Sequence, residues 1–210
     1  MNNKNNLVIT IGRSFGSGGR EIGRKLADTL GINYYDKELL EKVANESGLS
    51  KDYIELFDEK KPVMPVFSIL PIGSITNEEQ MEIRLQQLQR HVIERLVEEG
   101  PCVFVGRRTD LLLHGRHNTY NIFITAPEEY CVARVVQRDG LTEQESLDKI
   151  RRMNRNRKAY YNYTGEGHWG ESSNYNLCID SSILGVEGSV VLIQKYIDLC
   201  LMQRKTETRA

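Results

Sequence analysis

A glycine-rich stretch from Leu7 to Arg24, LVITIGRSFGSGGREIGR, constrains the fold of this chain more than any other segment. Its β-branched residues predict a strand, and the glycines that follow free the backbone so that successive N–H groups can converge on an anion. Ile22, Leu26 and Leu30 recur at helical spacing, so the glycines end at a helix N-terminus, where N–H groups favour phosphate. The stretch predicts a phosphate-binding turn; a tight turn without a ligand is the competing interpretation.

The turn departs from the standard phosphate loop, G-x-x-x-x-G-K-[ST], in which a lysine contacts the β- and γ-phosphates and a hydroxyl contacts Mg²⁺. Counted from Gly18, Gly19 and Arg20 stand in the places of those residues. We therefore expect Arg20, with its bulkier planar side chain, to do the work of the missing lysine.

Composition excludes several classes of protein. The chain has 210 residues and a net charge of −1, which suits one domain and implies no bulk attraction to nucleic acid or to an anionic membrane. We find neither an apolar signal core nor a membrane-spanning run, and expect a cytoplasmic protein. The 4 cysteines lie far apart without a C-x-x-C pair, which favours free thiols in a reducing compartment over disulfides or a zinc site.

Strand and helix patterns alternate along the chain, which predicts a parallel sheet covered on both faces, the three-layer α/β/α sandwich of P-loop proteins. Asp36 is expected to open a helix through about Asn45, either as a helix cap or as a site residue. The expected strands after the first are 32–35, 102–105, 119–125 and 177–180, and the other expected helices are 78–99, 127–138, 142–161 and 185–202.

We expect a single domain over residues 1–210, with a core at about 5–138 and 170–203 and a lid at about 140–169. An excursion at about 60–77 is rich in proline and large apolar residues and has no clear period. Such a patch is too large to leave in water, so it is expected to cover a cleft or to join two subunits in a homodimer.

Arginines gather at two places that a ligand could use. Arg107 and Arg108 follow a buried strand, and ligands of open α/β sheets bind outside the carboxyl ends of strands. The helix at 142–161 carries Arg151, Arg155 and Lys158 on one face, where like charges repel each other and an anion would relieve the repulsion. Surface arginines and a solvated basic helix face are the competing interpretations.

Several segments together resemble the cytidylate kinase-like family within the nucleoside monophosphate kinases. The resemblance spans nearly the whole chain, and its most specific parts are GSGGREIG and RKAYYNYTG. The matching segments are ITIGRSFGSGGREIGRKLADTLG, YYDKELL, VFVGRRTDLLL, IFITAPEEYCVARVVQR, RRMNRNRKAYYNYTGEGHWG and NYNLCID.

The resemblance implies a core sheet of five parallel strands, an ATP site, a site for a small-molecule acceptor and an arginine-bearing helical lid. It implies that ATP phosphates are held by Gly16, Ser17, Gly18, Gly19 and Arg20, and that Mg²⁺ is used. No Ser or Thr follows at the usual Mg²⁺ position, so Ser17 or Ser14 is expected to supply the hydroxyl ligand instead. The resemblance also implies that Asp36, Arg107 and Arg108 bind the acceptor. Arg155 and Arg157 match lid arginines that act in catalysis together with Arg20.

The expected function is therefore an ATP-dependent phosphotransferase, with CMP or dCMP as the first candidate acceptor. Loss of the lysine and of recognisable metal ligands also suits a nucleotide-binding regulatory or sensor protein without phosphoryl transfer. A kinase for a metabolite other than a nucleotide is the third hypothesis, favoured if the excursion lines the acceptor site.

Overall fold

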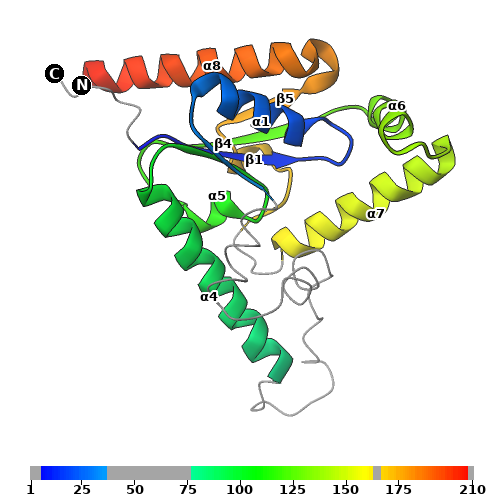
Figure 1. Cartoon of the computed structure of the whole chain (residues 1–210), viewed down its shortest axis with the longest axis horizontal. Helices are drawn as coiled ribbons and strands as arrows, with labels where there is room; N and C mark the ends of the chain where they lie inside the picture. Colours follow the sequence, from blue (N-terminus) through cyan, green and yellow to red (C-terminus); the bar gives the residue numbers. More distant parts are fainter. Residues whose placement is uncertain (1–5, 37–76, 163–166, 208–210) are drawn as a thin grey trace.

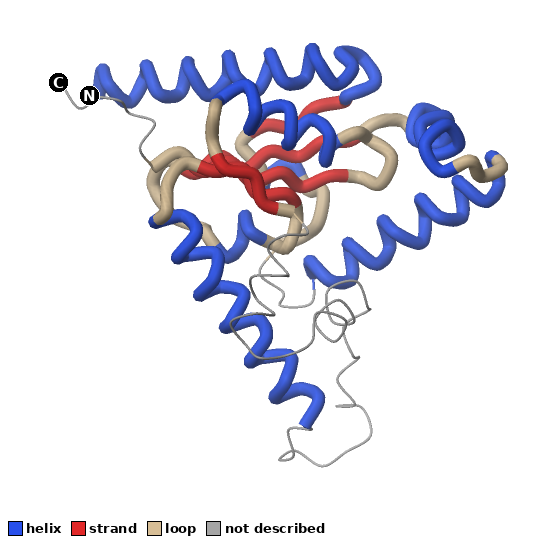
Figure 2. Tube along the Cα trace, viewed as in Figure 1, coloured by secondary structure: helices blue, strands red, loops and turns tan. Residues whose placement is uncertain are grey.

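A computed structural model of the chain describes residues 6–36, 77–162 and 167–207. Figure 1 shows the described elements, and Figure 2 separates helices, strands and loops by colour. The helix expected after Asp36 and nearly all of the proline-rich excursion lie outside these ranges. The homodimer contact that was expected at the excursion therefore also lies outside the described residues.

The described residues build one five-stranded sheet in the order β2-β3-β1-β4-β5. Every neighbouring pair runs parallel, with Ile9 beside Val103 on one side and Tyr120 on the other. The strands are β1 (Val8–Arg13), β2 (Asn33–Tyr35), β3 (Cys102–Val105), β4 (Thr119–Thr125) and β5 (Leu177–Asp180). The parallel sheet that the alternating pattern predicts is confirmed.

Helices connect and cover these strands. They are α1 (Gly19–Leu30), α4 (Asn77–Glu98), α5 (Thr109–Leu112), α6 (Glu128–Asp139), α7 (Glu143–Asn162) and α8 (Ser181–Glu207), with a 3₁₀ turn at Ser172–Asn174. Among the described residues, no helix is both long and apolar enough to cross a membrane.

Two apolar cores form because alternate residues of β1 point to opposite faces of the sheet. Ile9 and Ile11 pack toward α1 and α8, in one cluster with Leu26 and Ile193. Val8 packs on the other face in a cluster with residues of α4 and β3. Figure 1 shows α1 and α8 on one side of the sheet and α4 and α5 on the other, so the three-layer fold is confirmed.

The last helix differs from its prediction in length. It begins at Ser181, directly after β5, and continues to Glu207, while the apolar pattern predicts only 185–202. Gly185, with φ of 64° and ψ of −172°, interrupts the helical backbone, which separates a first short turn from the long closing helix. Residues 203–207, which lie beyond the predicted end, form the last turn of the helix.

Helices α6 and α7 form an arm beside the sheet. Figures 1 and 2 show them packed against each other and extending away from the strands at the end where α1 begins. Lys149 of α7 and Asp139 of α6 form an ion pair of 2.9 Å, and Arg151 reaches Glu128 at the same distance. This arm contains most of the segment that the sequence assigns to a lid.

Candidate active site

The glycine loop, residues 14–18, joins β1 to α1 and leaves the N-terminus of α1 open to a ligand. Gly16 and Gly18 have φ of 88° and 81°, a backbone conformation that L side chains rarely adopt. Gly18 is the N-cap of α1 and makes no side-chain capping hydrogen bond. The first N–H groups of a helix without such a cap are donors for an anion, so the loop fits phosphate groups.

Hydrogen bonds anchor the loop to the neighbouring strands. The amide of Ser14 donates to the carbonyl oxygen of Ile124 at 2.9 Å. The hydroxyl of Ser181 is buried and lies 2.6 Å from the carbonyl oxygen of Ser17 and 3.1 Å from that of Thr125, as donor to both. The carboxyl ends of β4 and β5 thus hold the loop in place before any ligand arrives.

Ser17, the expected metal ligand, has its hydroxyl directed into the protein. It is buried and donates to the carbonyl oxygens of Ser14 at 3.0 Å and Ile124 at 3.1 Å. Within the described ranges, no group of three or more His, Cys, Asp or Glu side chains could hold a metal ion. The hydroxyl of Ser17 is therefore not placed as a metal ligand in this conformation.

Arg20 and Asp36 form an ion pair through Nε and Oδ2, and Nη2 of the arginine lies 3.5 Å from Oδ1. The arginine side chain is 52% exposed and the aspartate side chain is 5% exposed. The guanidinium of Arg20 is thereby directed toward Asp36. The sequence assigns Arg20 to ATP and Asp36 to the acceptor, and the structure brings the two side chains into contact.

Arginines line a cleft between the carboxyl ends of β1 and β3 and the inner side of α7. This arginine cleft is bounded by Gly12, Arg13, Gly106, Arg107, Arg108, Asp110, Met153, Asn156, Arg157, Tyr160, Tyr161, Trp169 and Tyr175. The predicted residues Arg107, Arg108 and Arg157 all belong to it. Its lining combines positively charged arginines with aromatic side chains. Such a lining suits an anionic ligand that carries a flat ring.

Arg107 is a partly buried cation of the cleft, next to the more buried Arg108. Burial, followed by the charge of Arg13, lowers its pKa from 12.5 to about 10. The charges of Asp36 and Arg20 also act on Arg107, so the ion pair lies within electrostatic range of the cleft. Its backbone is held from α4, because Nε2 of Gln89 donates to the carbonyl oxygen of Arg107 at 3.1 Å.

Both arginines after β3 have a left-handed backbone, with φ of 64° at Arg107 and 54° at Arg108. Residues with a Cβ meet a cost of about 1–2 kcal/mol in this region. Strain of this kind collects at functional sites, where the surrounding structure holds it in place. Here the turn brings Arg107 and Arg108 into the lining of the cleft. It also places Arg108 at the N-cap of α5, with its guanidinium 5.7 Å from the ring centre of Tyr160.

A buried carboxylate lies beside the arginines. The hydroxyl of Tyr161 donates to Oδ2 of Asp110 at 2.5 Å, and both side chains are buried. Burial raises the pKa of Asp110, and hydrogen bonds from Tyr161 and from the backbone oppose that rise. The pKa of Tyr161 is raised as well, by burial first and by the charge of Asp110 second.

The two predicted catalytic arginines of α7 lie in different surroundings. Arg157 lines the cleft, and its Nη1 donates to the carbonyl oxygen of Arg13 at 3.1 Å. Arg155 is exposed and is not part of the cleft lining. Neighbours two apart on a helix face different directions, so only Arg157 is placed for contact with a ligand in this conformation. The role of Arg155 stays a prediction.

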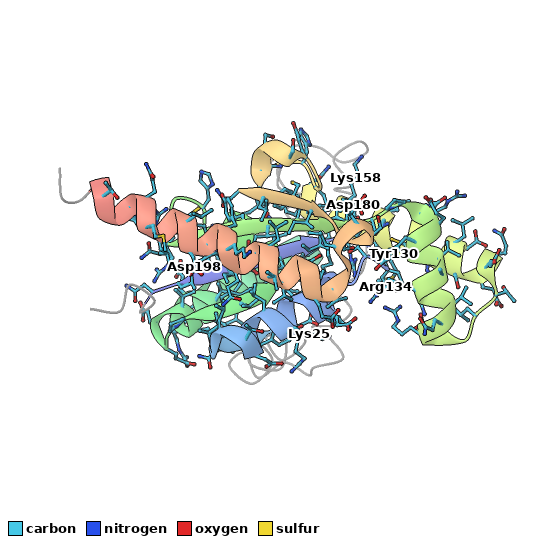
Figure 3. All side chains as sticks on the ribbon, turned by 90° about the horizontal axis from the view of Figure 1, so that it is seen from above. Lys25, Tyr130, Arg134, Lys158, Asp180 and Asp198 are labelled. Carbon is cyan, nitrogen blue, oxygen red and sulfur yellow. The ribbon has the colours of Figure 1, made fainter. Side chains whose placement is uncertain are left out.

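Arg13 was missed in the sequence, whereas Arg134 was considered either as a ligand contact or as an exposed salt-bridge partner. Arg13 ends β1 and lines the cleft, and Arg134 of α6 reaches Glu21 of α1 at 2.9 Å beside the glycine loop. Figure 3 shows Arg134 and Tyr130 on the side of α6 that faces the body of the protein. The pattern of a strand followed by a basic residue, used for Arg107, could also have indicated Arg13.

Comparisons of the sequence with known proteins find one family. The model of the cytidylate kinase-like family matches residues 8–183. The chain is 26% identical to the cytidylate kinase of Pyrococcus horikoshii, over 93% of this chain and 90% of that protein. It is 28% identical to the cytidylate kinase of Pyrococcus abyssi, over 91% of this chain and 94% of that protein.

Among solved structures, an uncharacterized protein from Eubacterium ventriosum aligns with a TM-score of 0.70 and 28% identity, over 91% of this chain and 98% of that chain. A shikimate kinase from Bacteroides thetaiotaomicron aligns with a TM-score of 0.52 and 15% identity, over 91% and 98%. The second likeness concerns the fold alone.

Proposed function

Because the chain belongs to the cytidylate kinase-like family, a kinase family of the nucleoside monophosphate type, we propose that it transfers the γ-phosphoryl group of ATP to CMP or dCMP. One observation carries the proposal. The glycine loop at the start of α1 directly follows Arg13, which lines a cleft together with Arg107 and Arg157, so donor and acceptor anions would meet there.

On the donor side, the backbone of Gly16, Ser17, Gly18 and Gly19 would hold the ATP phosphates, since left-handed glycines and an uncapped helix expose N–H groups there. Bound Mg²⁺ would neutralise charge on the phosphate oxygens, and it would be held chiefly by those oxygens and by water. Serine hydroxyls contribute to the loop's structure in this arrangement.

On the acceptor side, Arg107 and Arg108 would bind the monophosphate, and Asp36 would contact the acceptor at the edge of the cleft. The aromatic lining, which includes Tyr160 and Trp169, offers faces for a nucleobase. Arg157, anchored on the carbonyl oxygen of Arg13, would place positive charge between the two substrates.

The proposed reaction needs no covalent intermediate with the protein. An oxygen of the acceptor phosphate forms a bond to the γ-phosphorus while the bond from that phosphorus to the β,γ-bridging oxygen breaks, and ADP departs. Positioning in line and cations near the moving charge supply most of the rate enhancement. Arg157 is the proposed cation beside the moving charge. The catalytic role expected for Arg20 stays a prediction, because its guanidinium contacts Asp36.

A coupled assay of ADP release with the purified full chain tests this function. CMP and dCMP should give the highest kcat/KM in a panel with UMP, AMP, GMP and small hydroxy acids. Isothermal titration with ATP is run in parallel. Binding of ATP without turnover on any acceptor would contradict the kinase proposal.

One observation favours a second candidate, the nucleotide sensor. Arg20 is paired with Asp36, and the hydroxyl of Ser17 is bound to carbonyl groups, so neither expected catalytic group of the loop faces a ligand here. A sensor would bind ATP with no turnover, and the protein would change its partner binding or its oligomeric state instead.

A further inference from the structure

The place of the missing lysine is filled by another side chain. A Cβ built on Gly19 would lie 2.5 Å from Cβ of Arg13 and 3.2 Å from its Cγ. Real Cβ atoms do not approach that closely, so a side chain at position 19 and any side chain with a Cβ at position 13, lysine and arginine included, exclude each other in this backbone. The stem of Arg13 occupies the space in which a lysine stem would begin.

The far end of Arg13 also needs a glycine. A Cβ on Gly106, at the end of β3, would overlap Nη1 of Arg13 and lie 2.8 Å from its Cζ. The arginine therefore runs from the end of β1 toward the end of β3, through a channel that two glycines keep open. Gly106 has φ of 76°, so the turn itself also favours a glycine.

The guanidinium of Arg13 ends in the arginine cleft, among other cations. It lines the cleft together with Arg107 and Arg157. Its charge contributes to the lowered pKa of Arg107, and Arg157 donates to its carbonyl oxygen. Like charges gathered at a cleft beside a phosphate-binding loop are stabilised when an anion binds among them.

Arg20 is less suited to this position. Its guanidinium contacts Asp36, and its side chain is 52% exposed. Arg20 is not among the residues that line the arginine cleft, whereas Arg13 is. Of the arginines that flank the loop, Arg13 alone fills the volume of a side chain at position 19.

We propose that Arg13 is the cation of this phosphate loop, and that its guanidinium contacts the terminal phosphates of the nucleotide in place of the absent lysine. The assignment rests on the proposed function only in taking ATP as the ligand. A guanidinium donates two parallel hydrogen bonds to phosphate oxygens, which a lysine does not.

Binding measurements separate this role from catalysis. Arg13→Met keeps the stem that packs over Gly19 and removes the charge, so the variant should fold. In titrations with ATP, ADP and AMP, it should bind ATP about tenfold to a hundredfold more weakly, the size expected for a lost charged hydrogen bond, and bind AMP nearly as the native protein does. Arg13→Lys should retain most of the affinity.

Charge relocation gives a stricter test. In the double variant Arg13→Gly with Gly19→Lys, the cation moves to the standard position and the clash disappears, so ATP affinity should recover at least tenfold over Arg13→Met. Gly19→Lys alone should be destabilised, because both side chains then compete for one space. Arg24→Ala removes an arginine that stacks on Tyr34 of β2 and serves as the matched control.

Native-like ATP binding by Arg13→Met would overturn the assignment, and so would equal loss of ATP and AMP. The same holds if Arg20→Ala, rather than Arg13→Met, lowers ATP affinity selectively. If the native protein binds ATP but phosphorylates no acceptor, the kinase proposal is contradicted. The titrations would still show whether Arg13 contacts the terminal phosphates of ATP.

Discussion

Asn154 of α7 accepts the amide hydrogen of Phe15 through its Oδ1 at 2.7 Å, which attaches the arm to the glycine loop. The ring of Phe15 contacts two cations, with the guanidinium carbon of Arg138 at 5.0 Å and that of Arg157 at 5.3 Å from its centre. The arm and the loop therefore form one contact surface before a ligand binds.

Asn154→Ala should loosen this contact. The Phe15 amide loses its acceptor, so its hydrogen exchange should accelerate about tenfold, equivalent to roughly 1.4 kcal/mol for one hydrogen bond. Arg155→Ala, which changes an exposed neighbour on the same helix, is the control and should leave that amide unchanged. Equal exchange in all three proteins would show that the contact does not hold the loop.

Gly16→Ala should destabilise the protein more than its backbone angle alone explains. The new Cβ would lie 2.8 Å from Cβ of Cys131, so strain and overlap should together cost about 2–4 kcal/mol. Gly31→Ala is a matched control, because Gly31 has φ of 64° with nothing within 4 Å of the added Cβ. It should cost only about 1 kcal/mol. Urea unfolding measures both values.

Asp36→Asn should affect the acceptor rather than the fold. Its arginine partner is half exposed, and ion pairs of this kind contribute about 1 kcal/mol or less, so the free energy of unfolding should change little. If Asp36 contacts the acceptor, the KM for CMP should rise about tenfold or more while the KM for ATP stays within about twofold. An unchanged KM for CMP would contradict a role of Asp36 in acceptor binding.

Tyr161→Phe should destabilise the protein by about 1–3 kcal/mol, since the buried carboxylate of Asp110 loses its 2.5 Å hydrogen bond. Tyr130→Phe is the control on α6 and should cost less than about 0.5 kcal/mol. Thermal and urea unfolding report the difference. A similar cost for both variants would contradict the importance of the Asp110 contact.

Asp110 also predicts a pH dependence of stability. Its pKa in the folded protein lies above the ordinary 3.8, because burial disfavours the charged form. The folded state then holds the proton more tightly, so this group's contribution to stability falls as pH rises from 3.8 toward the folded pKa. Unfolding free energies between about pH 4 and 8 should show a smaller decrease in Asp110→Asn than in the native chain. Parallel curves would contradict this.

The regular elements were largely predictable from the sequence because their signals are local. The apolar runs at 102–105, 119–125 and 177–180 became strands with those bounds. The long helix expected at 78–99 is α4, Asn77–Glu98. Period and flanking glycines decide such elements without knowledge of the rest of the chain.

The site was less predictable because its contacts join distant residues. The glycine loop and the arginines after β3 have local signals, and they were found. The path of Arg13 depends on glycines at 19 and 106, and the partner of Asp110 is Tyr161 on another helix. Arg20 seemed the natural substitute for a lysine one residue away, but only the fold reveals that Asp36 lies beside it.

The hydroxyl of Ser181 ties the carbonyl groups of Ser17 and Thr125 together, and this has a consequence for synthesis on the ribosome. The residues of the glycine loop lie within the first tenth of the chain, but the hydroxyl that holds the loop belongs to residue 181, near the other end. A nascent chain that has not yet exposed residue 181 lacks that fastening. Affinity for nucleotide should therefore be acquired late in translation, after most of the sheet has been made.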